Sequence, residues 1–182
     1  MSEETIIRYC APTLASIKTG SLFSCRFESD AAMRESIRAL NRRLSGKGLR
    51  VMPLRYGDGR GLIYVYRPGR LRSDLQDGHA CRLLCEHGYC CENANRCVAR
   101  LRERIRQSGD FPHEIGLFLG YPPEDVDGFI NRKAEAKFCG CWKVYGDVDS
   151  ARKEFAKYKK CTDIYLKKHA GGTDIEKLAV AG

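Results

Sequence analysis

The spacing of hydrophobic residues in the first third of the chain predicts a strand followed by a helix. Residues 21–27 (SLFSCRF) alternate between apolar and polar and end at a turn, which is typical of a strand. A helix is expected next, between an N-cap at Ser29 and a stop at Gly46. Its apolar side chains recur on one helical face: Met33, Ile37, Leu40 and Leu44.

A β-hairpin is predicted immediately after this helix. The β-rich runs LRVMPLRY and GLIYVYR are separated by GDGR, and Asp-Gly is a strong signal for a tight hairpin turn. Pro53 lies inside the first run and cannot donate a ladder hydrogen bond. The first strand of the hairpin should therefore be an edge strand or carry a bulge.

The rest of the chain is dominated by helical spacing. Residues 70–134 read as helices throughout, and "FPHEIGLFLGYPPEDVDGFI" within them predicts a helix, a tight turn and a second helix. Residues 139–146 predict a further strand, and a long helix is expected from about 149 to 169. The final tail is expected to dock through three apolar residues, Ile175, Leu178 and Val180.

This order of elements predicts an α+β fold. It matches the split βαβ (ferredoxin-like) layout: a sheet of about four strands, a helical insertion over residues 70–134 before the last strand, and a long C-terminal helix. We expect residues 1–182 to form a single domain, because a chain of this length can bury a core without disulfides or zinc.

Composition indicates a cytoplasmic protein with reduced thiols. No apolar run approaches the roughly 20 residues that span a bilayer, so no membrane association is expected. The acidic N-terminus MSEETIIRYC lacks the pattern of a signal peptide. In such a chain, ten cysteines indicate free thiols, a metal or catalysis rather than a disulfide framework.

The segment HACRLLCEHGYCCENANRC (79–97) raises three alternatives: a metal site, a redox site, or small packed thiols. Its spacings do not form the paired two- to four-residue gaps of structural zinc. Leu83 and Leu84 share the predicted helix with the first two cysteines, which favours thiols packed in or beside the core. No metal is favoured, and the candidate ligands over the whole chain are Cys81, Cys85, Cys90, Cys91, Cys97, Cys139, Cys141 and Cys161.

Three residues are candidates for catalysis. Cys10 is a lone thiol near a proline, with no base identifiable beside it. His113 and Glu114 are neighbours that could form an acid–base couple or half of a metal site. They are not a HExxH motif, because Leu117 stands where the second histidine would be. The alternative is a capping Glu114 in a helix's first turn, with His113 bonded to a nearby loop.

The formal net charge of +9 predicts an acidic partner. Basic residues outnumber acidic ones over the chain as a whole, whereas residues 110–127 contain five acids and no lysine or arginine. Three of these carboxylates open the second helix of the predicted helix–turn–helix and would repel phosphate, which argues against nucleic acid. The residues expected to contact a ligand or partner are Arg55, Tyr64, Tyr66, Arg67, Tyr121, Trp142 and Lys143.

Several strings along the chain resemble one protein family. "YCAPTLASIKTGSLFS", "LIYVYRPGRL", "FPHEIGLFLGYPPEDVDGFI", "CGCWKVYGD" and "KCTDIYLK" are similar to domain-of-unknown-function family 3793, a family of uncharacterised bacterial proteins. The resemblance implies no activity and no cofactor. It implies gene neighbours of the flavodoxin or iron-transport kind, hence a flavodoxin-like acidic partner. Cysteines over residues 79–97 depart from the family pattern, while CGCW and Cys161 fit it.

Three functions stay open from the sequence, with the cofactor unknown. The first is a non-enzymatic basic module that docks an acidic partner or a phosphorylated ligand. The second is a thiol-based metal or redox protein that uses Cys139, Cys141 and Cys161, with or without the cysteines of residues 81–97. The third is an enzyme that uses Cys10 and the His113–Glu114 pair.

Overall fold

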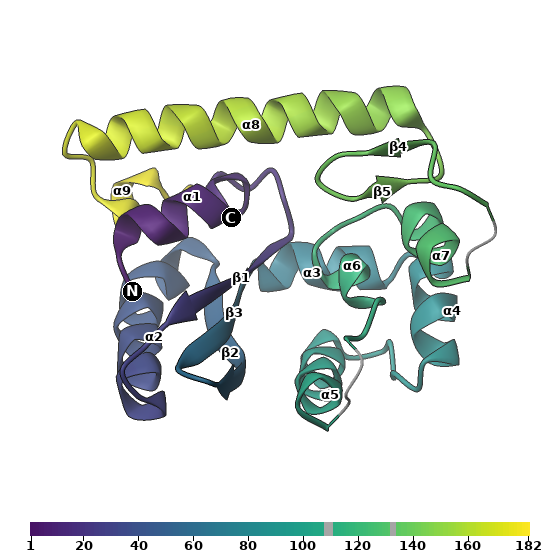
Figure 1. Cartoon of the computed structure of the whole chain (residues 1–182), viewed down its shortest axis with the longest axis horizontal. Coiled ribbons are helices and arrows are strands. Elements are labelled where there is room, and N and C mark those ends of the chain that lie inside the picture. Colours follow the sequence, from purple (N-terminus) through teal and green to yellow (C-terminus); the bar gives the residue numbers. More distant parts are fainter. Residues whose placement is uncertain (108–110, 132–133) are drawn as a thin grey trace. The chain divides into compact units, whose positions relative to one another are not determined.

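The computed structural model describes residues 1–107, 111–131 and 134–182, and the chain divides into two compact units (Figure 1). Unit 1 comprises residues 1–69 and 160–182, and unit 2 comprises residues 70–159. The long helix α8 (Val148–Ala170) contributes to both units. The α+β class and the long C-terminal helix are therefore confirmed.

Unit 1 is a small antiparallel sheet covered by helices on one face. The strand order is β1-β3-β2, so β3 lies between two strands that α2 connects in sequence. One apolar core joins α1, α2, α9 and this sheet face, and Cys161, Tyr165 and Leu166 of α8 pack against it. The elements are α1 (Glu3–Leu14), β1 (Gly20–Arg26), α2 (Asp30–Leu44), the 3-10 turn η1 (Ser45–Lys47), β2 (Arg50–Gly57), β3 (Arg60–Tyr66) and α9 (Ile175–Leu178).

Local chemistry explains the ends of these elements. The Ser29 side chain accepts a hydrogen bond from the amide of Ala32 and starts α2, as predicted. The α2 helix ends at Leu44, just before the predicted stop at Gly46, and the 3-10 turn η1 that follows is ended by Gly48, at φ 73° in the left-handed conformation. The hairpin turn is confirmed, with both Asp58 and Gly59 at positive φ.

Pro53 interrupts the pairing of the edge strand β2. The register of β2 against β3 shifts between Pro53 and Arg55, and β2 has β3 as its one partner in the sheet. The bulge at an edge strand is thus confirmed, because an edge position tolerates a residue without an amide hydrogen.

A buried arginine connects the first helix, the η1 turn and the tail of unit 1. The Arg67 guanidinium donates to the carbonyls of Thr13 and Leu14, both at 2.7 Å, at the end of α1, where the last carbonyls have no amide partner within the helix. It also donates to the carbonyls of Lys47 at 3.1 Å and Val180 at 2.8 Å. Hydrogen bonding therefore explains why this charged side chain can be 2% exposed.

The tail docks largely as predicted. Ile175 and Leu178 are buried in the core of unit 1. Val180 differs, because its side chain is 48% exposed and the residue is held through its backbone, whose amide donates to the Leu14 carbonyl.

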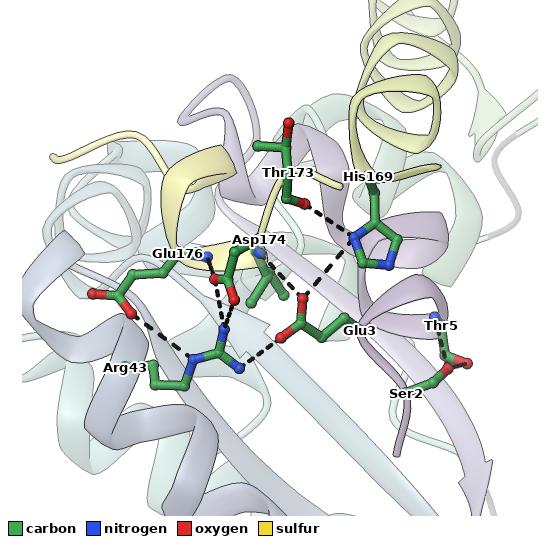
Figure 2. A network of polar contacts seen from close by, with 9 residues as sticks. Ser2, Glu3, Thr5, Arg43, His169, Thr173, Asp174 and Glu176 are labelled. Atoms are coloured by element: carbon green, nitrogen blue, oxygen red, sulfur yellow. Dashed lines mark hydrogen bonds and ion pairs between the residues drawn. The ribbon is translucent and has the colours of Figure 1, made fainter. Parts of the chain in front are cut away.

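A second arginine joins α1, α2 and α9 at the surface of unit 1 (Figure 2). Arg43 lies 2.6 Å from Glu3 and 2.6 Å from Asp174, and 3.9 Å from Glu176. Glu3 also accepts from the Ile175 amide at 3.2 Å. These contacts, foremost the hydrogen bond to Glu3, raise the pKa of Arg43 and fix the last short helix against the first two.

Unit 2 is mainly helical. The predicted helical character of residues 70–134 is found in five helices among the described residues, separated by irregular connections. They precede a short hairpin that leads into α8. The elements are α3 (Pro68–Leu75), α4 (Gly78–Glu86), α5 (Ala94–Gln107), α6 (Ile115–Phe118), α7 (Pro123–Asn131), β4 (Phe138–Cys139) and β5 (Lys143–Val144).

The prediction of one strand over residues 139–146 is wrong. The chain reverses within this segment, so that β4 and β5 pair with each other in a two-stranded sheet of their own. The segment adds no fourth strand to the sheet of unit 1, and the ferredoxin-like arrangement is not confirmed. Over the described residues, no helix is both long and apolar enough to cross a bilayer.

We expect Arg43→Ala to lower the free energy of unfolding by about 1.5 kcal/mol. A partly exposed arginine that binds two carboxylates contributes more to stability than an ordinary surface ion pair does. Arg8→Ala is the matched control. Among the described residues Arg8 forms an ion pair with Glu4, both side chains are more than half exposed, and its loss should cost less than about 0.5 kcal/mol. Equal effects in urea unfolding would contradict this role for Arg43.

Candidate functional site

Unit 2 contains a cavity of about 240 Å³ between α6, α7 and the β4–β5 hairpin. Its walls are almost entirely apolar, and the ionisable side chains among them come from three segments of the chain. The lining residues are Phe111, His113, Ile115, Gly116, Tyr121, Asp125, Val126, Phe129, Trp142 and Lys143.

The Asp125 carboxylate holds the hairpin against α7. Asp125 lies in the first turn of α7 and is 3% exposed. It accepts hydrogen bonds from the Trp142 indole Nε1 at 2.7 Å and from the amides of Tyr145 at 2.7 Å and Gly146 at 2.8 Å. The buried carboxylate and three donors thereby satisfy one another, and the indole of Trp142 is fixed in the pocket wall.

Close packing of α7 against the hairpin depends on a glycine. A Cβ atom at Gly128 would lie 2.5 Å from Cγ of Tyr145, well inside van der Waals contact. Any larger residue at this position would push the hairpin away from α7, and the hydrogen bonds to Asp125 would be lost with it.

Aromatic rings form one wall of the pocket. Trp142 stacks on Tyr121, with ring centroids 4.7 Å apart and an interplanar angle of 27°. Trp142 also forms a T-shaped contact with Phe155, with ring centroids 4.5 Å apart and an interplanar angle of 83°. Burial raises the pKa of Tyr121 to about 12, so its hydroxyl stays protonated at neutral pH.

Two nitrogen bases flank the opposite ring, Phe129. The Lys143 Nζ atom lies 5.3 Å from the Phe129 ring centroid, and the imidazole of His113 meets the same ring edge-on at 4.9 Å and 88°. His113 is exposed to solvent. The pocket therefore combines an apolar interior with a lysine ammonium group and an imidazole beside Phe129.

Glu114 does not share this environment with His113. Its carboxylate is 2% exposed and accepts from the Tyr89 hydroxyl at 2.8 Å, and Arg104 Nε lies 3.1 Å away. Burial, together with the Glu114 contact, raises the pKa of Tyr89. The Glu114 side chain makes no capping hydrogen bond to α6, in contrast to the capping alternative, and instead contacts Tyr89 and Arg104.

Three cysteine sulfurs meet in a separate part of unit 2, on α4 and the loop that follows it. Cys81 and Cys85 are one helical turn apart on α4, and Cys91 folds back toward them. The three Sγ atoms all lie within 4.8 Å of one another, and those of Cys85 and Cys91 are 3.8 Å apart. We call these three residues the thiol cluster.

The cysteines of residues 79–97, for which the sequence predicts thiols packed in or beside the core, differ widely in exposure. Cys97 is fully buried, in agreement with this prediction. Cys85 and Cys90, however, are exposed, and Cys81 and Cys91 are half-buried. Four of these five sulfurs therefore do not serve as core atoms.

A family model described as "Protein of unknown function (DUF3793)" matches residues 6–179. The chain belongs to this family. The resemblance noted in the sequence is thereby confirmed over nearly the whole chain. No curated protein and no solved structure matches the chain.

The described structure of this DUF3793 chain divides the predicted binding residues into two groups. Tyr121, Trp142 and Lys143 come together in the pocket with His113. The other four lie in unit 1 and do not form a comparable site. Arg55 is exposed on β2, Tyr64 and Tyr66 are buried and stacked at 4.6 Å, and Arg67 binds backbone carbonyls.

The remaining cysteines of the DUF3793 chain are dispersed. Cys139 and Cys141 are exposed in the β4–β5 hairpin, where Cys139 ends β4 and Cys141 lies in the connection to β5. Cys161 is half-buried on α8. Cys10 is fully buried in α1, where burial raises the pKa of its thiol to about 12.

We predict that Cys10 reacts with thiol reagents only when unit 1 unfolds. At pH 8 a thiol with a pKa of about 12 is almost wholly protonated, and the thiolate is the reactive form. Peptide mass spectrometry after brief labelling should find exposed Cys139 modified at least about 100-fold faster than Cys10. Comparable rates would instead support a nucleophilic Cys10.

We expect Asp125→Ala to lower the free energy of unfolding by about 3 kcal/mol, because an indole and two amides lose their acceptor. Trp142 is the only tryptophan in the sequence, so its fluorescence should report the change directly. Asp163→Ala, at an exposed position on α8, should change stability by less than about 0.5 kcal/mol. An Asp125 variant as stable as wild type would show that the carboxylate does not organise the site.

Proposed function

We propose that this DUF3793 protein is a binding protein for a small planar ligand that carries an anionic group. The observation that supports the proposal is the convergence of a stacked aromatic wall, Trp142 on Tyr121, and a lysine, Lys143, on one apolar cavity. From the sequence we expected an acidic partner or a phosphorylated ligand, and we now propose that the ligand is a small molecule.

The walls favour a flat, apolar ligand body. The rings of a ligand in the cavity would contact Trp142, Val126 and Phe129 instead of water. This burial makes the free energy of binding more favourable by about 25 cal/mol for each Å² of apolar surface removed from water. An aromatic ligand also gains about 0.5 to 1.5 kcal/mol for each well-placed ring contact. At about 240 Å³, the cavity accommodates one or two fused rings.

The charges around the cavity favour an anionic group on that ligand. The negative charge of Asp125 is offset by the three donors that it accepts from, one of which is the Trp142 indole. Lys143 Nζ is the ammonium group among the described lining residues, and His113 lies against the same Phe129 ring. A carboxylate or phosphate beside Phe129 would meet a cation without displacing a protein carboxylate.

The carboxylates near the pocket favour binding over catalysis. General acid–base chemistry needs a group within hydrogen-bond reach of the substrate. Asp125 is committed to the hairpin, and Glu114 to Tyr89 and Arg104. Neither Asp125 nor Glu114 is therefore available to form an acid–base pair with His113.

Calorimetric titration with 2-naphthoate and with its uncharged isostere 2-naphthamide tests this proposal. We expect naphthoate to bind more tightly, and Lys143→Met to weaken its affinity at least about 10-fold, equivalent to about 1.4 kcal/mol. The same substitution should leave the naphthamide affinity unchanged, since the amide has no charge for Lys143 to neutralise.

Lys159→Met is the matched control, because Lys159 is exposed on α8 and does not line the cavity. It should leave both affinities at their wild-type values. The proposal is wrong if naphthoate does not bind at millimolar concentration, if the two compounds bind equally, or if Lys143→Met and Lys159→Met behave alike.

A further inference from the structure

The thiol cluster has the arrangement of a ligand set rather than of core residues. Cys81 and Cys85 project from the same face of α4, and the loop after Gly88, which adopts φ 78°, brings Cys91 to them. The Cys91 thiol lies 3.3 Å from the Cys81 carbonyl oxygen and 3.8 Å from Cys85 Sγ. Cys85 is exposed, so an ion from solvent can reach the sulfurs.

The geometry points to a binding site for a single thiophilic metal ion, Zn²⁺ being the reference ion, with Cys81, Cys85 and Cys91 as its three protein ligands. A tetrahedral ion with Zn–S bonds of about 2.3 Å holds its sulfurs about 3.8 Å apart. Cys85 and Cys91 already lie at 3.8 Å, and every sulfur pair in the cluster lies within 4.8 Å. Movements of about 1 Å or less would complete the site.

The distances and the ligand type select the class of metal. Cysteines that hold an iron–sulfur cluster bind separate iron atoms and must be spread around it, whereas these sulfurs surround one point. Thiolates prefer soft ions such as Zn²⁺ or Cu⁺ over Mg²⁺ or Ca²⁺. A mononuclear site for a soft ion follows.

The neighbouring cysteines do not complete the ligand set in the described structure. Cys97 Sγ donates to the carbonyl of Cys90 at 3.1 Å, and the Cys90 side chain is exposed. Three protein sulfurs leave one position of a tetrahedral ion for water or an exchangeable ligand. Structural zinc sites, by contrast, have four protein ligands and no open position.

Binding releases protons in a defined number. Three S–H bonds break as three metal–sulfur bonds form, and the three protons pass to the buffer, so that Zn²⁺ and three thiolates carry a net charge of −1. No electron is transferred, and no oxidant or reductant is needed.

The test uses Zn²⁺ and Co²⁺ alone with full-length protein that has been purified under reducing, anaerobic conditions. We expect one Zn²⁺ per chain after removal of excess metal, and a thiolate-to-cobalt charge-transfer band with Co²⁺. Cys85→Ser and Cys91→Ser should each lower metal affinity at least about 100-fold, because each removes one of three ligands. Circular dichroism of both variants without metal verifies that they fold.

Cys90→Ser is the matched control. Cys90 is adjacent to Cys91 in the same loop but lies outside the thiol cluster, so its loss should leave metal content unchanged. Lys143→Met should also keep the ion, which separates this site from the ligand pocket. The inference is overturned if wild-type protein binds no Zn²⁺ and shows no cobalt band, if Cys85→Ser and Cys91→Ser retain the ion, or if a Cys85–Cys91 disulfide is present in the reduced preparation.

Discussion

The ligand pocket depends on one buried carboxylate. Asp125 would be costly to bury alone, but it receives the Trp142 indole and the amides of Tyr145 and Gly146. These three donors belong to the hairpin, and the carboxylate belongs to α7. The same hydrogen bonds therefore join the two elements, position the aromatic wall and stabilise the negative charge of the buried carboxylate.

The two units use buried charge in complementary ways. In unit 1, Arg67 donates to backbone carbonyls at the end of α1, in η1 and in the tail. In unit 2, Asp125 accepts from backbone amides and an indole. Neutral backbone groups, and in unit 2 also an indole, hydrogen-bond to these two charges, so both have a structural role. Lys143 differs from both, because its ammonium group lies beside Phe129 in the pocket wall, where we propose that it meets the anionic group of a ligand.

Sequence patterns predicted the elements whose hydrophobic spacing is regular. The α2 helix, the hairpin with its bulge at Pro53, and α8 follow from local periodicity and turn chemistry. The α1 helix was missed, because Pro12 in its last turn is typical of a loop. The β4–β5 hairpin was read as one strand, since its two-residue strands are too short to show alternation.

The sites were harder to predict because they depend on long-range contacts. Tyr121, Trp142 and Lys143 were identified from residue type, and the structure places them in one cavity. The role of Asp125 was not predicted, because an acidic residue in the first turn of a helix is already explained by its favourable interaction with the helix dipole. The thiol cluster was not favoured as a metal site, because the sequence spacing of its cysteines matches no common zinc motif. Their sulfurs come together through one turn of α4 and the loop at Gly88.

The most direct test of the account is the NMR signal of the Trp142 indole N–H, which is the one indole signal of the protein. If Asp125 accepts this hydrogen bond, the proton should exchange with solvent as slowly as the backbone amides of the core, and the signal should shift when 2-naphthoate is added but little with the amide. An indole proton that exchanges within seconds, or a signal that neither compound moves, would contradict an Asp125-organised pocket for anionic ligands.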